Sequence, residues 1–226
     1  MSDLSPALAS AAERMENMSR RGLLGKAVLT GIAAMPVVGL LASTSQAAGR
    51  YQQPIDASAR EAFTDIRLHE NDHVAFLKGS LGSHARPKPK LKGLNTDSFA
   101  SFVTLSRTFE NVGVGAYLGA LPYIKNPDYV AAAGSIALIE ARHAGFLNVF
   151  SGKDVSTQAK TGKPSAFDKP LTLQEVVNAA GPYIASLNGG PPASFTPGDD
   201  ISILNFALLL EYIEAEYYNI NIPKYF

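Results

Sequence analysis

Four segments of this 226-residue chain carry an apolar stripe at helical spacing, and a glutamate interrupts each stripe near its middle. Residues three and four apart lie on one face of a helix. The four stripes are Phe63, Ile66, Glu70, His73, Leu77; Phe99, Val103, Ser106, Glu110, Gly113, Tyr117; Ala133, Ile136, Glu140, His143, Leu147; and Leu204, Ala207, Glu211, Glu214, Tyr218. Because an unpaired carboxylate is costly to bury, each glutamate must be protonated, paired or bound to a cation.

The same spacing predicts an all-α fold with four main helices, at about residues 57–79, 97–121, 128–150 and 200–220. Asp97 is a plausible N-cap of the second helix, and Pro223 follows the end of the fourth. No stretch shows a convincing strand alternation. Residues 151–199 form a long crossover linker, in which Thr172 should cap a short helix over residues 173–184.

The buried glutamates favour a site for two metal ions. Together they would concentrate negative charge in one region of the core, where few basic residues face inward to neutralise it. A single Glu-x-x-His motif is common on solvated helix faces, but two such motifs beside two lone glutamates are hard to obtain by chance. The predicted ligands are Glu70, His73, Glu110, Glu140, His143 and Glu211, with Glu214 as an additional candidate.

Composition limits the chemistry of this site. The chain has no cysteine, so any metal must be held by histidine and carboxylates, which suits iron or manganese, with zinc acquired on purification as another outcome. Lys+Arg and Asp+Glu both number 20, which gives no support for a nucleic-acid or anionic-membrane surface.

Residues 1–48 are predicted to be an export signal outside the folded domain, which would then span residues 49–226. The segment Ser19-Arg-Arg-Gly-Leu-Leu-Gly25 resembles the twin-arginine (Tat) motif, and an uncharged stretch at residues 27–42 follows it. Small residues around Ala47 offer a cleavage site. This predicts a periplasmic or extracellular protein with no membrane contact after cleavage, and an uncleaved N-terminal anchor is the alternative.

At its candidate ligands the chain resembles the ferritin-like superfamily, in the branch that includes desiccation-related proteins. Four segments carry the resemblance: HENDHVAFL at 69–77, TFENVGVGAYLGA at 108–120, AAAGSIALIEARHAGF at 131–146 and NFALLLEYIEAEYY at 205–218. The resemblance implies a ferritin-like four-helix bundle that binds two metal ions.

The resemblance also implies a role for each ligand. Glu70 and His73 match the family's helix-B pair, and Glu140 and His143 its helix-D pair. Glu110 matches the lone helix-C glutamate, which often bridges the metals, and it is the best bridging candidate. Glu211, seven residues before Tyr218, matches the helix-A ligand. Glu214 is expected to be an additional ligand or to accept a hydrogen bond from a ligand residue.

The order of these helices departs from the family. The segment that resembles helix A comes last, so the order is B-C-D-A, as in a circular permutation. The two long connections can span the bundle. Docking of the last helix into a second copy, which would give a swapped homodimer, is the alternative.

These features favour a di-metal oxidoreductase that handles dioxygen or peroxide, of ferroxidase, peroxidase or catalase type. A non-enzymatic stress, desiccation-related or metal-sequestering protein is the second hypothesis. A bundle whose site is vestigial and whose linker binds a partner is the third. The sequence does not separate these hypotheses, because a fold does not determine a function.

Overall fold

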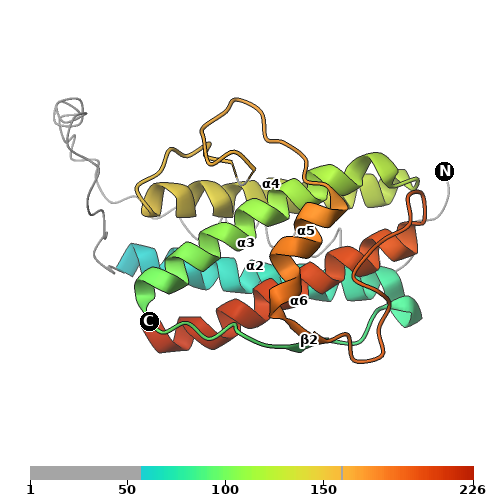
Figure 1. Cartoon of the computed structure of the whole chain (residues 1–226), viewed down its shortest axis with the longest axis horizontal. Coiled ribbons are helices and arrows are strands. Elements are labelled where there is room, and N and C mark those ends of the chain that lie inside the picture. Colours follow the sequence, from blue (N-terminus) through green and yellow to red (C-terminus); the bar gives the residue numbers. More distant parts are fainter. Residues whose placement is uncertain (1–56, 159) are drawn as a thin grey trace, which may run out of the picture. The chain divides into compact units, whose positions relative to one another are not determined.

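The computed structural model describes residues 57–158 and 160–226, which form an all-α helical bundle. The predicted export signal at residues 1–48 lies outside the described residues. The four main helices are α2 (Ala57–Leu81), α3 (Phe99–Ala120), α4 (Pro127–Phe150) and α6 (Asp200–Tyr225). Figure 1 shows that α2 and α3 run in one direction and that α4 and α6 run in the other.

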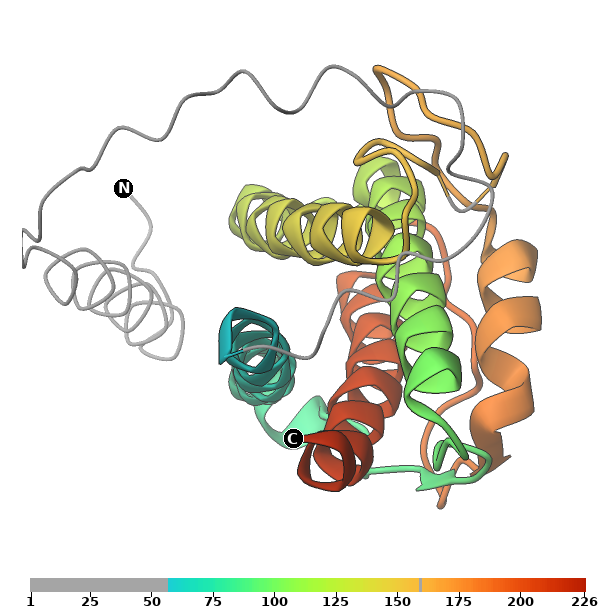
Figure 2. The ribbon, with the colours of Figure 1, turned by 90° about the vertical axis from the view of Figure 1, so that its left-hand side faces the viewer.

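The helices associate as two closely packed pairs. α2 lies against α6, and α3 lies against α4, while the contact between α3 and α6 joins the pairs (Figure 2). The last helix therefore packs in the bundle of its own chain. Because connected helices of a bundle run antiparallel when loops are short, the parallel neighbours need long connections, which the chain provides before α3 and before α6.

Local sequence sets the helix ends, and two predicted ends were wrong. Ser98, and not Asp97, caps α3, because its side chain accepts a hydrogen bond from the backbone N–H of Ser101. α6 continues through Pro223 to Tyr225. A proline in the last helical turn removes only one backbone hydrogen bond, so the helix tolerates it there.

The long linker contains helix α5 (Leu173–Ala180), which Thr172 caps through a full capping box with Glu175. α5 ends earlier than predicted, because a 3-10 turn over Gly181–Tyr183 precedes strand β2 (Ile184–Ser186). β2 pairs antiparallel with β1 (Lys90–Leu91), in the other long connection. Both strands are too short to show an alternation in the sequence, and together they tie the two crossovers to each other.

Glycines let the linker approach α3. A Cβ on Gly115 would lie 2.5 Å from the Leu171 side chain, and one on Gly119 would overlap the Leu171 carbonyl oxygen. The backbone N–H of Leu171 donates to the Gly115 carbonyl at 2.9 Å. The helix thus accepts the linker where it lacks side chains, and α5 is held against the outside of α3 (Figure 2).

Apolar side chains fill the bundle in two clusters. The larger cluster is rich in aromatic rings and includes Phe63, Phe102 and Tyr217. The smaller is mainly aliphatic and includes Leu77 and Leu208. Within the described residues, α4 alone is long and apolar enough to span a membrane, but it also supplies two buried ionisable side chains to the core, as core helices of globular proteins can.

Candidate metal centre

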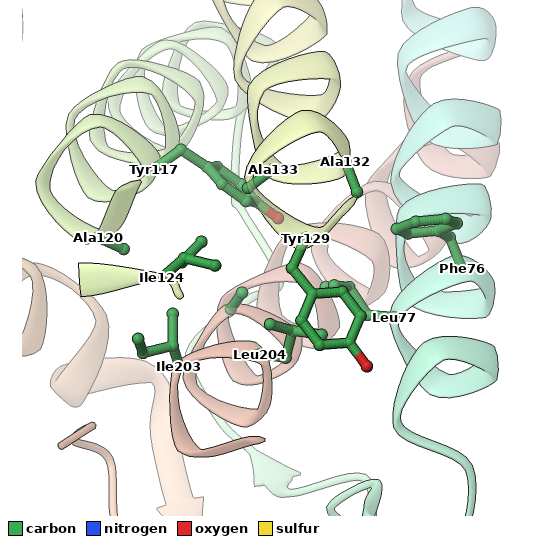
Figure 3. Close-up of a pocket in the computed structure, with 11 residues that line it drawn as sticks. Phe76, Leu77, Tyr117, Ala120, Ile124, Tyr129, Ala132, Ala133, Ile203 and Leu204 are labelled. Atoms are coloured by element: carbon green, nitrogen blue, oxygen red, sulfur yellow. The ribbon is translucent and has the colours of Figure 1, made fainter. Parts of the chain in front are cut away.

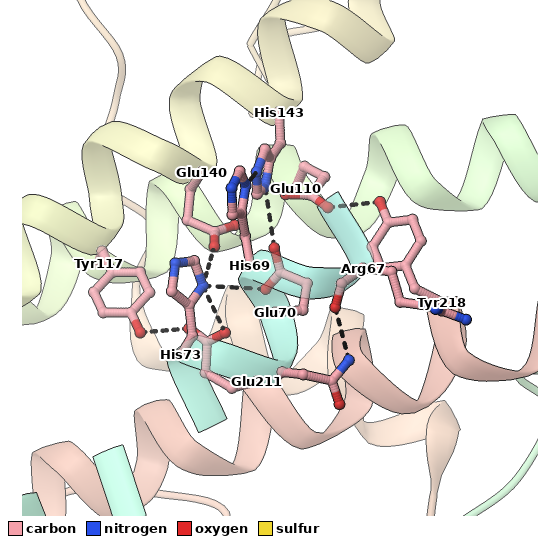
Figure 4. Close-up of polar contacts among 11 residues, drawn as sticks. Arg67, His69, Glu70, His73, Glu110, Tyr117, Glu140, His143, Glu211 and Tyr218 are labelled. Carbon is pink, nitrogen blue, oxygen red and sulfur yellow. Dashed lines mark hydrogen bonds and ion pairs between the residues drawn. The ribbon is translucent and has the colours of Figure 1, made fainter. Parts of the chain in front are cut away.

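The glutamates and histidines of all four main helices meet inside the bundle in two groups (Figure 4). Ligand atoms in each group lie within 4.8 Å of one another, and the groups are Glu70, Glu110, Glu140 and His143, and Glu70, His73, Glu140 and Glu211. All six residues are buried. Each group thus has one histidine and one carboxylate of its own, and the groups share two carboxylates.

The shared carboxylates are Glu70 and Glu140, and Glu110 belongs to one group only. The sequence favoured Glu110 as the bridging ligand, whereas the geometry favours Glu70 and Glu140. Glu110 lies near His143 only, whereas Glu70 lies near both His73 and His143.

Oxygen atoms crowd around one nitrogen of each histidine. His73 Nδ1 lies 3.2 Å from Glu70 Oε2, 3.3 Å from Glu140 Oε1 and 3.2 Å from Glu211 Oε2. His143 Nδ1 lies 3.0 Å from both Glu70 Oε1 and Glu110 Oε2. One imidazole nitrogen carries at most one hydrogen, so it cannot satisfy two or three carboxylates.

Several carboxylate oxygens accordingly lack any hydrogen bond. They are Glu70 Oε1, both oxygens of Glu140, and Glu211 Oε2. Glu70 Oε1 is close to His143 but poorly aligned, so the short distance is an ion-pair contact and not a hydrogen bond. Ligands about 2.1 Å from a shared ion lie about 3.0–3.4 Å from one another in octahedral or tetrahedral arrangements. The observed spacings of 3.0–3.3 Å fit ligands around a metal ion.

The electrostatics reflect the negative charge that is concentrated in the centre. Burial and the neighbouring Glu70 and Glu110 raise the pKa of Glu140 well above its ordinary value. Burial raises the pKa of Glu211 to about 7, although His73 opposes the rise. Burial alone would lower the pKa of His73, but Glu211 and Glu70 raise it well above its ordinary value. Protons thus take the place of cations when no metal is bound.

Two tyrosines bind the unshared carboxylates, and each tyrosine donates to the glutamate of the other's helix. Tyr117 of α3 donates a hydrogen bond to Glu211 of α6 at 2.5 Å, and Tyr218 of α6 donates to Glu110 of α3 at 2.6 Å. Each tyrosine lies seven residues after the glutamate of its own helix. The two halves of the site therefore have the same construction. From the sequence, ordinary core aromatics were the favoured interpretation of both tyrosines, and a hydrogen bond to a ligand residue, which the structure contains, was the alternative.

His69 also joins the centre. Its ring stacks on His143 with 5.2 Å between centroids, and His69 Nδ1 lies 2.9 Å from His143 Nε2. If His143 Nε2–H donates, His143 Nδ1 keeps its lone pair for a ligand bond. In the sequence, His69 lies about 100° round the helix from Glu70, which favours a position that faces solvent or a neighbour over a ligand role. Its spacing of four from His73 was the signal that places both histidines on one helix face.

Glu214 is buried but belongs to neither ligand group. Its Oε1 and Glu140 Oε2 lie 3.5 and 2.5 Å from the point where a Cβ on Gly113 would stand. Gly113 thus leaves the space that the Glu140 carboxylate fills. Burial raises the pKa of Glu214 well above its ordinary value, and Glu140 and Glu70 add to the rise.

Comparison with known proteins agrees with this centre. A model of the ferritin-like domain matches residues 12–153, more than half of the chain. The chain belongs to the ferritin-like domain family. The match includes α2, α3 and α4 and the residues before them, and it ends before α6, which provides Glu211. No curated protein and no solved structure matches the chain.

Membership of the family and the buried carboxylate–histidine cluster together are compatible with a di-metal site. The choice between iron and manganese, and the chemistry performed, belong to the proposal that follows.

Proposed function

We propose that this chain is a di-metal carboxylate oxidoreductase whose oxidant is dioxygen or peroxide. The single observation that carries the proposal is the pair of ligand groups, each centred on one histidine, that share Glu70 and Glu140. Carboxylates that are common to two neighbouring ligand groups are typical of sites that hold two metal ions. Iron or manganese bound there would supply the capacity for electron transfer.

The protein's own residues would have distinct tasks. His73 and Glu211 would hold one ion, and His143 and Glu110 the other. Tyr117 and Tyr218 fix the orientation of the unshared carboxylates through their hydrogen bonds. The apolar clusters on either side keep water from the centre, which strengthens its electrostatic interactions.

The test is to load the purified protein with iron(II), add dioxygen or peroxide, and follow both iron oxidation and metal stoichiometry. We expect two metals per chain and rapid oxidation. Glu140→Ala should lose both ions because Glu140 serves both groups, while Glu110→Ala should weaken only one. Failure of the parent protein to bind metal under several loading conditions would refute the proposal.

The second candidate function is metal sequestration without turnover. It is favoured if two ions bind tightly but iron(II) is not oxidised faster than in a control without protein. A vestigial site is disfavoured by the complete ligand set, because each group contains four buried donors.

We also propose that residues 1–48 are a Tat export signal and that residues 49–226 form a bundle with permuted helix order B-C-D-A, whose connection 151–199 joins helix D to helix A. Glu211 on the last helix, beside ligands from α2 and α4, supports this order. Deletion of residues 1–48 should leave metal binding intact, whereas a chain that stops before α6 should not bind two ions. Loss of both ions in the first deletion would contradict the permutation.

A further inference from the structure

An apolar cavity of about 30 Å³ lies between α2, α3, α4 and α6 (Figure 3). It is at the end of the bundle that contains the aliphatic cluster of Leu77 and Leu208. Half-buried side chains line its outer part, among them Phe76, Tyr129 and Ala133. Buried Leu77, Tyr117 and Leu204 line its inner part. The cavity therefore leads from near the surface toward the core.

Its inner wall touches the candidate metal centre through one residue. Tyr117 lines the cavity with its ring, while its hydroxyl group donates to Glu211 at 2.5 Å. The polar atom of this tyrosine is thus already engaged, and the surface that faces the cavity is the ring.

The apolar lining of the cavity determines which molecules can bind in it. A buried water needs two to four polar partners, and apolar cavities of this kind stay dry and take xenon. Peroxide, like water, needs hydrogen bonds that the lining does not offer. The volume corresponds to roughly two water-sized spheres, which fits a diatomic molecule and is too small for an aromatic ring or a lipid chain.

We propose that this cavity binds one small apolar molecule, dioxygen, and forms the route by which dioxygen reaches the metal centre. The inference rests on the proposed function, and it names dioxygen rather than peroxide as the molecule that enters here.

A first experiment needs no turnover. In the redox-inert zinc form of the full chain, dissolved dioxygen is paramagnetic and should broaden the methyl resonances of Leu77, Ile203 and Leu204, and xenon should shift the same resonances. A second cavity of about 20 Å³, lined by Leu210, Ile213 and the Glu214 carboxylate, provides internal control methyls. Silent methyls at the first cavity, or broadening that is equal at both, would overturn the proposal.

A second experiment fills the cavity. Ala133→Leu should abolish the xenon shift and slow iron(II) oxidation by dioxygen, while oxidation by peroxide keeps its rate. Ala207→Leu fills the same cavity from α6 and serves if the first variant does not fold. Ala179→Leu makes the same change in the second cavity and should change neither rate.

The outcomes separate the two claims. Equal slowing with dioxygen and peroxide would overturn the cavity's role, because damage to the centre would explain it. Binding of iron with silent methyls would defeat the cavity and leave the proposed function standing. Broadened methyls in a protein that binds no metal would show that the cavity takes dioxygen, but would defeat the proposed function and the cavity's role as a route to the metals.

Discussion

Buried polar groups differ between two regions of the bundle: the aromatic end, around Phe63 and Phe102, and the candidate metal centre. At the aromatic end, Phe63 packs against Phe102 at 5.1 Å and Phe226 at 5.3 Å between ring centroids. The buried hydroxyl group of Tyr217 there has a partner, because it donates to the Phe102 carbonyl oxygen at 2.6 Å. In the centre, four carboxylate oxygens have none. The aromatic end thus satisfies this hydroxyl group within the protein, whereas the unpaired oxygens of the centre are compatible with bound cations.

The largest effect is expected from a substitution at the aromatic end of the bundle. Phe102→Ala removes a fully buried ring and should lower the free energy of unfolding by about 3–5 kcal/mol. Since Phe102 provides no ligand, urea denaturation should show the same loss with and without zinc. A loss that depended strongly on zinc would mean that the two regions are not separate.

Metal removal tests the centre. Each zinc ion, at about 100 times its dissociation constant, should stabilise the protein by about 2.7 kcal/mol, so chelation should lower the melting temperature. Glu140→Gln should remove most of this dependence, because it eliminates a carboxylate common to both groups.

Glu216→Gln is the matched control, since Glu216 pairs with Lys88 near the surface and lies in neither ligand group. It should keep the full response to zinc. A melting temperature of the parent protein that does not change with chelator would argue strongly against a metal centre.

Two adjacent tyrosines allow a closer comparison. Tyr218→Phe removes a hydrogen bond to the Glu110 carboxylate and should cost about 2 kcal/mol, whereas Tyr217→Phe removes one to a backbone carbonyl and should cost about 1 kcal/mol. Only the first cost should shrink in zinc, because the ion shares the charge of Glu110. Chemical denaturation of both variants with and without zinc measures this, and equal zinc dependence would contradict the distinction.

Much of the bundle and of its buried carboxylate–histidine cluster could be predicted from sequence, because both follow from helical periodicity. The stripe that contains Glu70 and His73 is local information, and it places both residues on one buried face. Periodicity does not show which glutamate belongs to both ligand groups, because that depends on how far each side chain reaches across the core. Glu110 and Glu140 look alike as mid-stripe glutamates, yet only Glu140 lies between both histidines.

The short helix of the second connection and its Thr172 cap were predicted, but the contacts that the connections make were beyond sequence reasoning. The pairing of Lys90 with Ser186 joins residues far apart in the chain through backbone atoms, which leave little trace in side-chain pattern. The contact of Leu171 with Gly119 explains why the helix interior contains glycine, but the partner of a glycine cannot be identified from its own sequence.

The smallest expected effect is the pH dependence of the metal-free protein. The pKa of Glu211 is about 7 when folded and 4.5 ordinarily, so its protonated form stabilises the fold. That stability is fully present below pH 4.5 and is lost as pH rises through 7. Between pH 6 and pH 8 the loss from Glu211 should be about 1 kcal/mol, and Glu140 and His73, whose pKa values are also raised, act in the same direction.

Glu214→Gln separates this effect from metal binding, because Glu214 is buried beside the centre but belongs to neither ligand group. Its raised pKa means that the parent protein must keep this carboxyl protonated as pH rises. The amide removes that requirement, so the variant should be more stable than the parent at pH 8, and the difference should vanish near pH 4.5. Thermal melts of both metal-free proteins across this range measure it. A parent protein that gained stability from pH 6 to pH 8 without metal would show that the buried carboxylates are already compensated, and the contrast with the aromatic end would fail.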